Sequence, residues 1–392
     1  MSTAMIYLDS NATTRPTPAV VEAVSGALTE GWCNPSSLHR PGQIAKMQME
    51  RARTQIAQLI HAKPRDITFT SGGTEACDLA IRGLLGAAEG RRVVVTSPVE
   101  HSAVRELCKR LSACGEIEIR TAPINRFGQV HPEGLASLLD DAVALVSIQW
   151  ANNENGAVQP VQAIGAMCKE RGIPFHVDAT QWVGKEVTDV SSNWCDVLTF
   201  SSHKFHGPKG VGMAWISRHA RIKPCIAGQQ ELGRRGGTEN VPGIVGAGVA
   251  AAECSAWLAD PANKQRAEAV RDAFERGILE AIPDAVLNSP TEPGSRIWNT
   301  ANIGFPGLES EALLILLSER GVCASAGAAC SSGALEPSAV LLAMGIPYDV
   351  AHGSVRFSTC RETTHEQAAE AVRIVTAVVA QLRQSWAHVQ RA

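Results

Sequence analysis

The chain has 392 residues, of which 45% are hydrophobic and 19% are charged, as in an ordinary globular protein. This length exceeds what one hydrophobic core usually supports, so we expect a large domain and a smaller one. The formal net charge of −3 gives no broad basic field for nucleic acid or an anionic membrane, whereas small anionic ligands remain possible.

The eleven cysteines are odd in number, scattered along the chain and never spaced as C-x-x-C. This pattern predicts neither a disulfide framework nor a zinc ribbon, and it favours a cytoplasmic protein. Residues 1–8 show no basic region followed by a long apolar core, and we expect no apolar run long enough to span a bilayer.

Short apolar runs separated by helix-like stretches predict seven strands. In chain order they are 67–70, 93–96, 117–121, 143–148, 174–177, 197–200 and 211–216, with helices at 102–113 and 161–171 among the stretches between them. Strands that alternate with helices favour the α/β class, with a mostly parallel sheet covered on both faces.

The pattern changes after about residue 255. A long charged helical stretch at 266–282 is followed by a loop at 288–294 that contains proline and glycine. We therefore predict a large domain over 16–255 and a smaller α+β domain over 256–392.

A lysine lies directly after one of the predicted strands. Lys204 follows Ser201 and His203 and precedes a glycine turn. A lysine at this place can form a Schiff base with pyridoxal phosphate if cationic neighbours or desolvation keep its amine partly neutral. The hydroxyl and the imidazole could then donate to the phosphate, while the alternative for this motif alone is a surface lysine in a polar loop.

The first predicted strand ends in a glycine turn and a helix that begins near Thr74, just after Gly73. A helix start of this kind presents free N–H groups that suit a phosphate. The alternative is a tight turn in which Thr74 only caps the helix.

Polar residues follow three further strands. Asp178 ends one strand with Gln181 three residues on, and Asn153 and His101 follow two others. In open α/β sheets ligands bind at the carboxyl ends of strands. Asp178 could keep a pyridine nitrogen protonated, and Gln181 and Asn153 could bind the phenolic oxygen of that ring. His101 could stack on the ring and relay protons. As alternatives, the first three residues could only cap turns, and the histidine could be structural.

Residues 321–333 form a run of small residues around Cys330, with neither helical periodicity nor strand alternation, which favours a mobile loop. Taken alone, Cys330 could be an inert loop thiol. A mobile thiolate would suit a nucleophile that has to reach a substrate and then pass on what it has taken.

Seven segments together resemble the cysteine desulfurases, and they occur in the same order from end to end. They are 7–14, 34–39, the Thr74 loop, the Asp178 strand, the Lys204 loop, 233–240 and 351–358. The chain is most similar to the NifS type, in the group that also contains IscS, among the fold-type I, class V pyridoxal-phosphate-dependent enzymes. The resemblance also implies that residues 1–15 pack with the smaller domain.

The resemblance implies three sets of site residues. The cofactor set is Gly73, Thr74, His101, Asn153, Asp178, Gln181, Ser201, His203, Lys204 and Thr238; the catalytic set is Lys204, Cys330 and His101; and the substrate set is Asn34 and Arg356. Thr238 would reach the phosphate of the neighbouring subunit, which implies a homodimer. Arg356 would bind the substrate carboxylate through its guanidinium fork.

The implied reaction converts L-cysteine into L-alanine and leaves a persulfide on Cys330. Lys204 would take the α-proton and His101 would exchange a proton with the substrate thiol. The sulfur would pass to an iron-sulfur scaffold protein, with nitrogenase maturation as the implied pathway, and Cys330 could share an iron-sulfur cluster with that scaffold as a metal ligand.

Two alternatives remain. Another class V enzyme, such as a selenocysteine lyase or a small-molecule aminotransferase, would not need Cys330. A non-catalytic scaffold that binds iron-sulfur clusters through its cysteines would not need Lys204.

Overall fold

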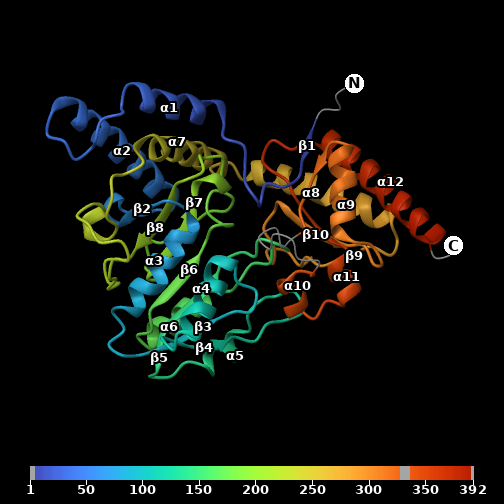
Figure 1. Cartoon of the computed structure of the whole chain (residues 1–392), viewed down its shortest axis with the longest axis horizontal. Coiled ribbons are helices and arrows are strands. Elements are labelled where there is room, and N and C mark those ends of the chain that lie inside the picture. Colours follow the sequence, from blue (N-terminus) through green and yellow to red (C-terminus); the bar gives the residue numbers. More distant parts are fainter. Residues whose placement is uncertain (1–4, 327–335, 390–392) are drawn as a thin grey trace.

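The computed structural model of the chain describes residues 5–326 and 336–389, and its elements are shown in Figure 1. At its centre is a seven-stranded sheet with the strand order β2-β8-β7-β6-β5-β3-β4. The strands are β2 (Ile67–Thr70), β3 (Val93–Thr96), β4 (Glu118–Thr121), β5 (Val143–Gln149), β6 (Phe175–Asp178), β7 (Val197–Ser201) and β8 (Gly212–Ile216). This confirms the predicted mostly parallel seven-stranded sheet of the α/β class.

The direction of the strands decides where their ends lie. The pairs from β7 to β4 are parallel, whereas β8 runs antiparallel to both β7 and β2. β2 therefore points the same way as β7, although antiparallel β8 lies between them. The carboxyl ends of β2, β3, β5, β6 and β7 consequently meet at one edge of the sheet, where a ligand site is expected.

Helices cover both faces of this sheet (Figure 1). Val93 and Val95 join one hydrophobic cluster while Val94 joins another, because successive side chains of a strand point to opposite faces. The first cluster packs α2 (Arg40–Leu59), α6 (Val161–Glu170) and α7 (Val241–Leu258) on the sheet. The second packs α3 (Gly73–Leu85) and α4 (Ser102–Ala113).

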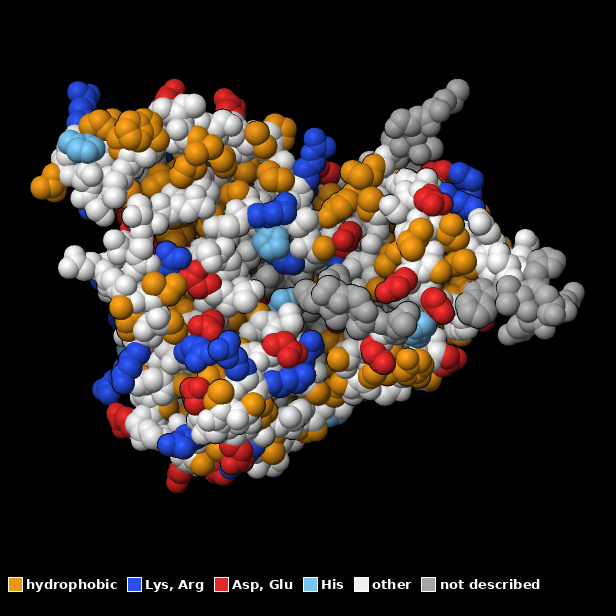
Figure 2. Space-filling model, viewed as in Figure 1, with side chains coloured by type: hydrophobic (Ala, Val, Ile, Leu, Met, Phe, Trp, Pro, Cys, Tyr) orange, Lys and Arg blue, Asp and Glu red, His pale blue; other side chains and the backbone are white. Residues whose placement is uncertain are grey.

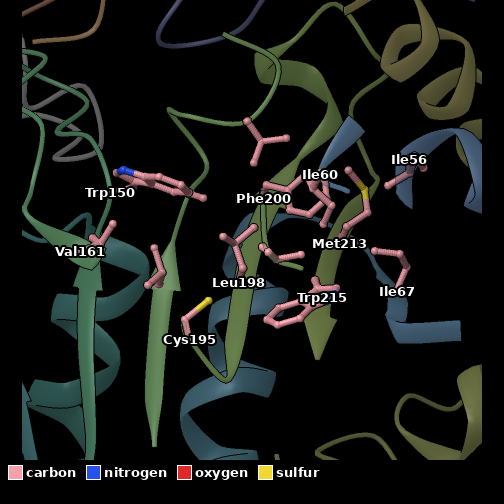
Figure 3. Packing of buried hydrophobic residues seen from close by; sticks show 14 of the residues in the cluster. Ile56, Ile60, Ile67, Trp150, Val161, Cys195, Leu198, Phe200, Met213 and Trp215 are labelled. Atoms are coloured by element: carbon pink, nitrogen blue, oxygen red, sulfur yellow. The ribbon is translucent and has the colours of Figure 1, made fainter. Parts of the chain in front are cut away.

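Figure 3 shows how side chains of the larger cluster pack together. Phe200 and Met213 from neighbouring strands point to one side together with Ile56 of α2 and Ile60, which follows that helix. All four side chains are buried. Burial of this many large apolar groups holds the sheet edges, and hence the strand ends, in fixed positions.

A second body has its own hydrophobic cluster. It contains α8 (Pro261–Ala281), α9 (Ser310–Glu319), α12 (His365–Val389) and a three-stranded antiparallel sheet of β9 (Val286–Leu287), β10 (Thr300–Gly304) and β12 (Ser354–Ser358). β1 (Ile6–Tyr7) pairs in parallel with β11 (Val322–Cys323), so the amino-terminal segment lies against this body. The exact limits 16–255 and 256–392 remain a prediction.

The remaining helices are α1 (Pro18–Thr29), α5 (Pro132–Ala136), α10 (Ala339–Ala343) and α11 (Tyr348–His352). α8 begins five residues before the predicted start at residue 266. Its first turn is set by Asp260, whose carboxylate accepts from Ala262 N at 3.0 Å, and by Pro261.

The expectation that no apolar run has membrane-spanning length was wrong for α7. Val241–Leu258 has 18 residues and a mean hydropathy of 1.4, which suffices by length and composition. Half of this helix is buried, and it packs against α1 and α2 with Ile244 and Ala251 in the main core. Its apolar character is thus explained by packing inside the protein.

Candidate active site

A cavity of about 270 Å³ lies at the carboxyl edge of the sheet, where the second body approaches it. Ten of the predicted site residues line it: Gly73, Thr74, His101, Asn153, Asp178, Gln181, Ser201, His203, Lys204 and Arg356. Nine come from the ends of strands and the turns that follow them, and Arg356 comes from β12. The cavity thus brings together predicted residues that are up to 283 positions apart in sequence, from Gly73 to Arg356.

Lys204 ends the short 3₁₀ turn Ser202–Lys204 that follows β7 directly. Its Nζ donates to the carbonyl oxygens of Asn11 at 2.6 Å and Ala12 at 2.9 Å. The turn itself is held by Thr14, whose Oγ1 donates to His203 O at 2.9 Å. The amino-terminal segment therefore fixes both the backbone and the amine of this lysine.

Asn11 joins the two bodies at this point. Its Nδ2 donates to Thr300 Oγ1 at 2.8 Å, and its Oδ1 accepts from Asn299 Nδ2 at 3.0 Å and from Lys185 Nζ at 2.9 Å. Its backbone oxygen accepts from Gln181 Nε2 at 3.0 Å as well as from the lysine described above. Each polar atom of this buried amide has a partner, so its orientation is fixed.

The amino terminus of α3 opens into the cavity. Gly72 is the N-cap and supplies no side-chain cap, so Thr74 is not the N-cap but lies in the first turn. A side chain at Gly73 would place its Cβ 3.3 Å from Thr180 Oγ1, which would narrow the cavity at the helix start. The uncapped N–H groups form an anion-binding corner together with Thr74 and Ser201.

His203 completes this corner. Burial and the neighbouring cations Lys204, Lys209 and Lys185 lower its pKa to about 4. Its Nδ1 lies 3.1 Å from Thr13 Oγ1. At neutral pH this imidazole is therefore uncharged, and it can offer an anion a hydrogen bond rather than a full charge.

Asp178 lies at the end of β6 with its side chain almost completely buried. Its Oδ1 accepts from Thr180 N at 3.0 Å. His176, two residues earlier on the same strand, is held by Ser147 and Thr199 at 2.9 Å each, and burial lowers its pKa to about 4. The His176 imidazole is therefore uncharged at neutral pH and adds no positive charge beside the Asp178 carboxylate.

His101 is the N-cap of α4, and its Nδ1 accepts from Ala103 N at 3.2 Å. Since Nδ1 is an acceptor, the proton of the neutral ring is on Nε2. Burial lowers the pKa of this histidine, although the nearby Asp178 carboxylate opposes the shift. The neighbouring Glu100 is fully buried, and burial raises the pKa of its carboxyl to about 8 despite hydrogen bonds from Ser97 at 2.5 Å and from the backbone of Gln149 at 2.9 Å.

Arg356 reaches the cavity from β12 and is 2% exposed. One terminal nitrogen donates to Asp9 Oδ1 at 2.8 Å and the other to Asn153 O at 3.0 Å. Its Nε is buried and has no hydrogen-bond partner in the described part of the chain. A guanidinium that lines a cavity is suited to bind a carboxylate, because it keeps its charge and offers planar N–H donors.

Three predicted residues do not line this cavity. Asn34 and Thr238 are exposed, and Asn34 Oδ1 accepts only a local bond from Ser36 N at 2.8 Å among the described residues. Cys330 lies outside the described residues. In the described ranges no three histidine, cysteine, aspartate or glutamate side chains form a metal-binding group. The role of Cys330 as a metal ligand shared with a scaffold therefore stays a prediction.

Sequence reasoning missed four residues that shape the site: Asp9, Asn11, Glu100 and Lys185. All four are polar residues close in sequence to a predicted site residue or to a strand end. In a single sequence this is only a weak sign that a residue belongs to the site. Lys185 follows Gln181 by four positions and has an apolar residue, Val183, between. Its burial became evident only from the fold.

Comparison with known proteins shows which family the chain resembles over its length. The model of the family "Aminotransferase class-V" matches residues 6–370. A cysteine desulfurase of Trichormus azollae is 45% identical over 380 residues, covering 97% of this chain and 94% of the relative. The cysteine desulfurase NifS of Azotobacter vinelandii is 43% identical, covering 96% of this chain and 93% of the relative.

Solved structures agree in fold. A NifS-like protein superposes with a TM-score of 0.88 at 34% identity, covering 96% of this chain and 99% of that one. SspA in complex with cysteine superposes with a TM-score of 0.79 at 31% identity, covering 91% of this chain and 99% of that one. These similarities extend over both bodies of the structure.

Proposed function

The chain belongs to the class V aminotransferase family, with cysteine desulfurases as its relatives, and from this premise we propose how its own residues carry out cysteine desulfuration. The family makes it a pyridoxal-phosphate-dependent enzyme of fold-type I. The single observation that carries the assignment of residues is the cavity that joins Lys204, Asp178 and the α3 amino terminus.

The chemistry of this donor set fits pyridoxal phosphate. An uncapped helix start with Thr74, Ser201 and His203 suits the phosphate, and Lys204 suits the aldehyde. The buried Asp178 carboxylate suits a protonated pyridine nitrogen. A Cβ at Gly73 would lie 3.3 Å from Thr180 Oγ1 and 3.5 Å from Ser201 Cβ, so a glycine leaves this region more space.

Bound pyridoxal phosphate supplies an electron sink that weakens the bonds to the α-carbon of the substrate. Lys204 would hold the cofactor, and its amine would take the α-proton of L-cysteine. The carbonyls of Asn11 and Ala12, at 2.6 Å and 2.9 Å, hold that amine at the cavity wall. Gln181 and Asn153, which line the same cavity, would bind the phenolic oxygen of the ring.

Arg356 orients the substrate by its carboxylate, and His101 exchanges a proton with the substrate sulfur. The lowered pKa of His101 leaves its ring neutral at pH 7, with an N–H at Nε2. A neutral imidazole can accept a proton and return it, which a permanently charged ring cannot do.

Cys330 accepts the sulfur. Its thiolate attacks the sulfur of L-cysteine, an S–S bond forms, and the Cβ–S bond breaks with its electron pair moving to the substrate. The carbon gains one hydrogen, which balances the thiol proton that Cys330 gave up, so the products are L-alanine and the Cys330 persulfide. This role comes from the family resemblance.

A homodimer completes the site. Asn34 and Thr238 do not line the cavity of their own chain, yet the adjacent residues Pro35 and Glu239 line one shared surface groove of about 660 Å³. Both segments therefore lie beside each other on the outside of one subunit. We assign this face to the partner, so that Thr238 reaches the partner's cofactor phosphate.

An exposed apolar patch lies next to this groove. Figure 2 shows hydrophobic side chains gathered over α1 and α2. Trp32 and Leu38, in the loop that joins these two helices, are 73% and 94% exposed. Patches of this kind mark interaction surfaces. The patch is therefore the surface that we assign to dimer contact.

We assign the sulfur to an iron-sulfur scaffold protein, with nitrogenase maturation as the pathway, because NifS of Azotobacter vinelandii is among the relatives. A cytoplasmic location belongs to the same proposal, since the ten described cysteines are unpaired. Purified scaffold that gains sulfide only in the presence of this chain and L-cysteine would support the assignment.

Mass spectrometry of the protein after incubation with L-cysteine tests the reaction and the residue together. The peptide that contains Cys330 is expected to gain one sulfur atom while L-alanine appears in solution. Cys330→Ser should abolish both, and Lys204→Ala should also abolish the visible absorption of the cofactor. Full sulfide release by Cys330→Ser would favour a selenocysteine lyase or aminotransferase type, and a colourless wild-type protein would favour a non-catalytic scaffold.

A further inference from the structure

A second lysine, Lys185, is buried beside the cavity without a role in the mechanism above. Its side chain is 4% exposed. Its Nζ donates to Gln181 Oε1 at 2.6 Å and to Asn11 Oδ1 at 2.9 Å, and no carboxylate of the described ranges forms an ion pair with it. Burying an amine with only neutral partners costs free energy of folding, so we expect this lysine to serve a function.

The two hydrogen bonds of Lys185 differ in how much their partners depend on them. Asn11 needs no help from the lysine, because Thr300 and Asn299 already fix the two ends of its amide at 2.8 Å and 3.0 Å. Within the described ranges the Gln181 amide has one other hydrogen bond, from its Nε2 to Asn11 O at 3.0 Å. Asn11 O can only accept, so it holds the nitrogen end of the amide, and the lysine supplies the one bond that holds the oxygen end.

The chemistry of the partners fixes which end of the Gln181 amide points where. An amine donates through its N–H bonds, so the atom that faces Lys185 must be the oxygen. The nitrogen is then at the opposite end, where one hydrogen binds Asn11 O and a second remains for an acceptor in the cavity. Two N–H bonds suffice for both contacts of the lysine, so this holds for the charged and the neutral amine alike.

We propose that Lys185 is a positioning residue that holds Gln181 with its amide nitrogen available to the ring oxygen of the cofactor. Without Lys185, the Gln181 oxygen would be buried and unpaired, and the amide would be held by a single bond. A reversed amide would present an oxygen to an oxygen. The inference rests on the proposed binding of pyridoxal phosphate.

A double-mutant cycle tests this role. The variants are Lys185→Met, which keeps the apolar stem, Gln181→Leu, which removes both polar ends, and the combination. Two quantities are measured on each purified protein: the dissociation constant of pyridoxal phosphate and the pH midpoint of its visible absorption when bound. The thermal midpoint of the cofactor-free protein is measured in parallel.

Lys185→Met is expected to weaken cofactor binding about tenfold and to shift the absorption midpoint, as the loss of one hydrogen bond to a buried group implies. In the Gln181→Leu background the same change should alter both quantities by less than about twofold, since the group that it acts on is gone. As a matched control, Lys264→Met removes a lysine that pairs with Glu186 at 2.6 Å and should leave both quantities unchanged.

Equal effects of Lys185→Met in both backgrounds would overturn the proposal and leave a purely structural role. If Lys185→Met does not fold, Lys185→Gln is carried through the same cycle, since a glutamine keeps a donor but no longer dictates the orientation of its neighbour. A wild-type protein that binds no pyridoxal phosphate would instead refute the proposed function itself.

Discussion

Arg356 donates to Asp9 Oδ1 at 2.8 Å, so the cation that we assign to the substrate carboxylate already has an anionic partner from the other end of the chain. The guanidinium is 3% exposed at its side chain and the carboxylate 20%. The pair also joins the amino-terminal segment to β12. Asp9 thus keeps a buried charge compensated before substrate binds.

Asp9→Asn is expected to destabilise the protein, because the Arg356 charge would remain buried without its compensating anion. Breaking a buried pair from one side costs about 3–5 kcal/mol, and the partial exposure of Asp9 reduces this to roughly 2 kcal/mol. Urea unfolding of the cofactor-free protein measures the difference. The double variant Asp9→Asn, Arg356→Met should recover part of the loss; if the single variant is as stable as wild type, the ion pair contributes nothing.

Arg356→Lys is expected to raise the KM for L-cysteine by about tenfold or more, since lysine keeps the charge but loses the fork that binds a carboxylate with two parallel bonds. Steady-state kinetics give the value. The visible absorption of bound cofactor should not change, because Arg356 is assigned to substrate alone. A loss of cofactor together with activity would show that the residue has a different role.

The sequence predicted the sheet well because each strand is short, apolar and flanked by turn residues, as in Val93–Thr96. The position of Lys204 followed from that pattern. What could not be predicted is the contact of the amino-terminal segment with the Lys204 turn, because a contact between Asn11 and Lys204 spans 193 positions and leaves no periodic signal. Thr74 was assigned a possible capping role because its hydroxyl suits one, but the backbone places Gly72 there.

The buried charges were missed for a related reason. A lysine or a glutamate in a polar motif is usually exposed, so composition gives no sign that Lys185 and Glu100 are buried. Their burial follows from packing between elements that are distant in sequence. Cys330 and its role still rest on resemblance, because this residue lies outside the described part of the chain.

Glu100→Gln is expected to flatten the dependence of stability on pH. Burial raises the pKa of Glu100 to about 8 in the folded protein, whereas an exposed glutamate titrates near 4.3. Between these values the folded state keeps a proton that the unfolded state has lost, so this group's contribution is complete below about pH 4.3 and is lost as the pH rises through about 8.

Urea unfolding at several pH values between 5 and 8 measures this effect. The free energy of unfolding of Glu100→Gln should fall less steeply with pH than that of wild type, by up to about 1.4 kcal/mol per pH unit. A glutamine oxygen can accept from Ser97 Oγ or from the Gln149 backbone as the carboxyl does, and its amide nitrogen can donate to the Ser97 hydroxyl oxygen, so folding should be preserved. Identical slopes in the two proteins would mean that the Glu100 carboxyl titrates outside this range.

Trp32→Glu is expected to weaken the proposed dimer. Trp32 is 73% exposed in the loop between α1 and α2, and a carboxylate placed in an apolar interface has to lose its hydration. Light scattering at several protein concentrations gives the molar mass, which should fall toward that of one chain. Ile315→Glu is the matched control, because Ile315 on α9 is 62% exposed but lies in the other body.

The same variant separates dimer formation from the active site. If Thr238 of the partner subunit binds the cofactor phosphate, dissociated Trp32→Glu should also bind pyridoxal phosphate more weakly, while Ile315→Glu should bind it as wild type does. If the dimer dissociates and the affinity for pyridoxal phosphate does not change, Thr238 of the partner subunit does not contribute to cofactor binding. A wild-type protein that is monomeric and fully active would remove the reason for placing Thr238 at a second site.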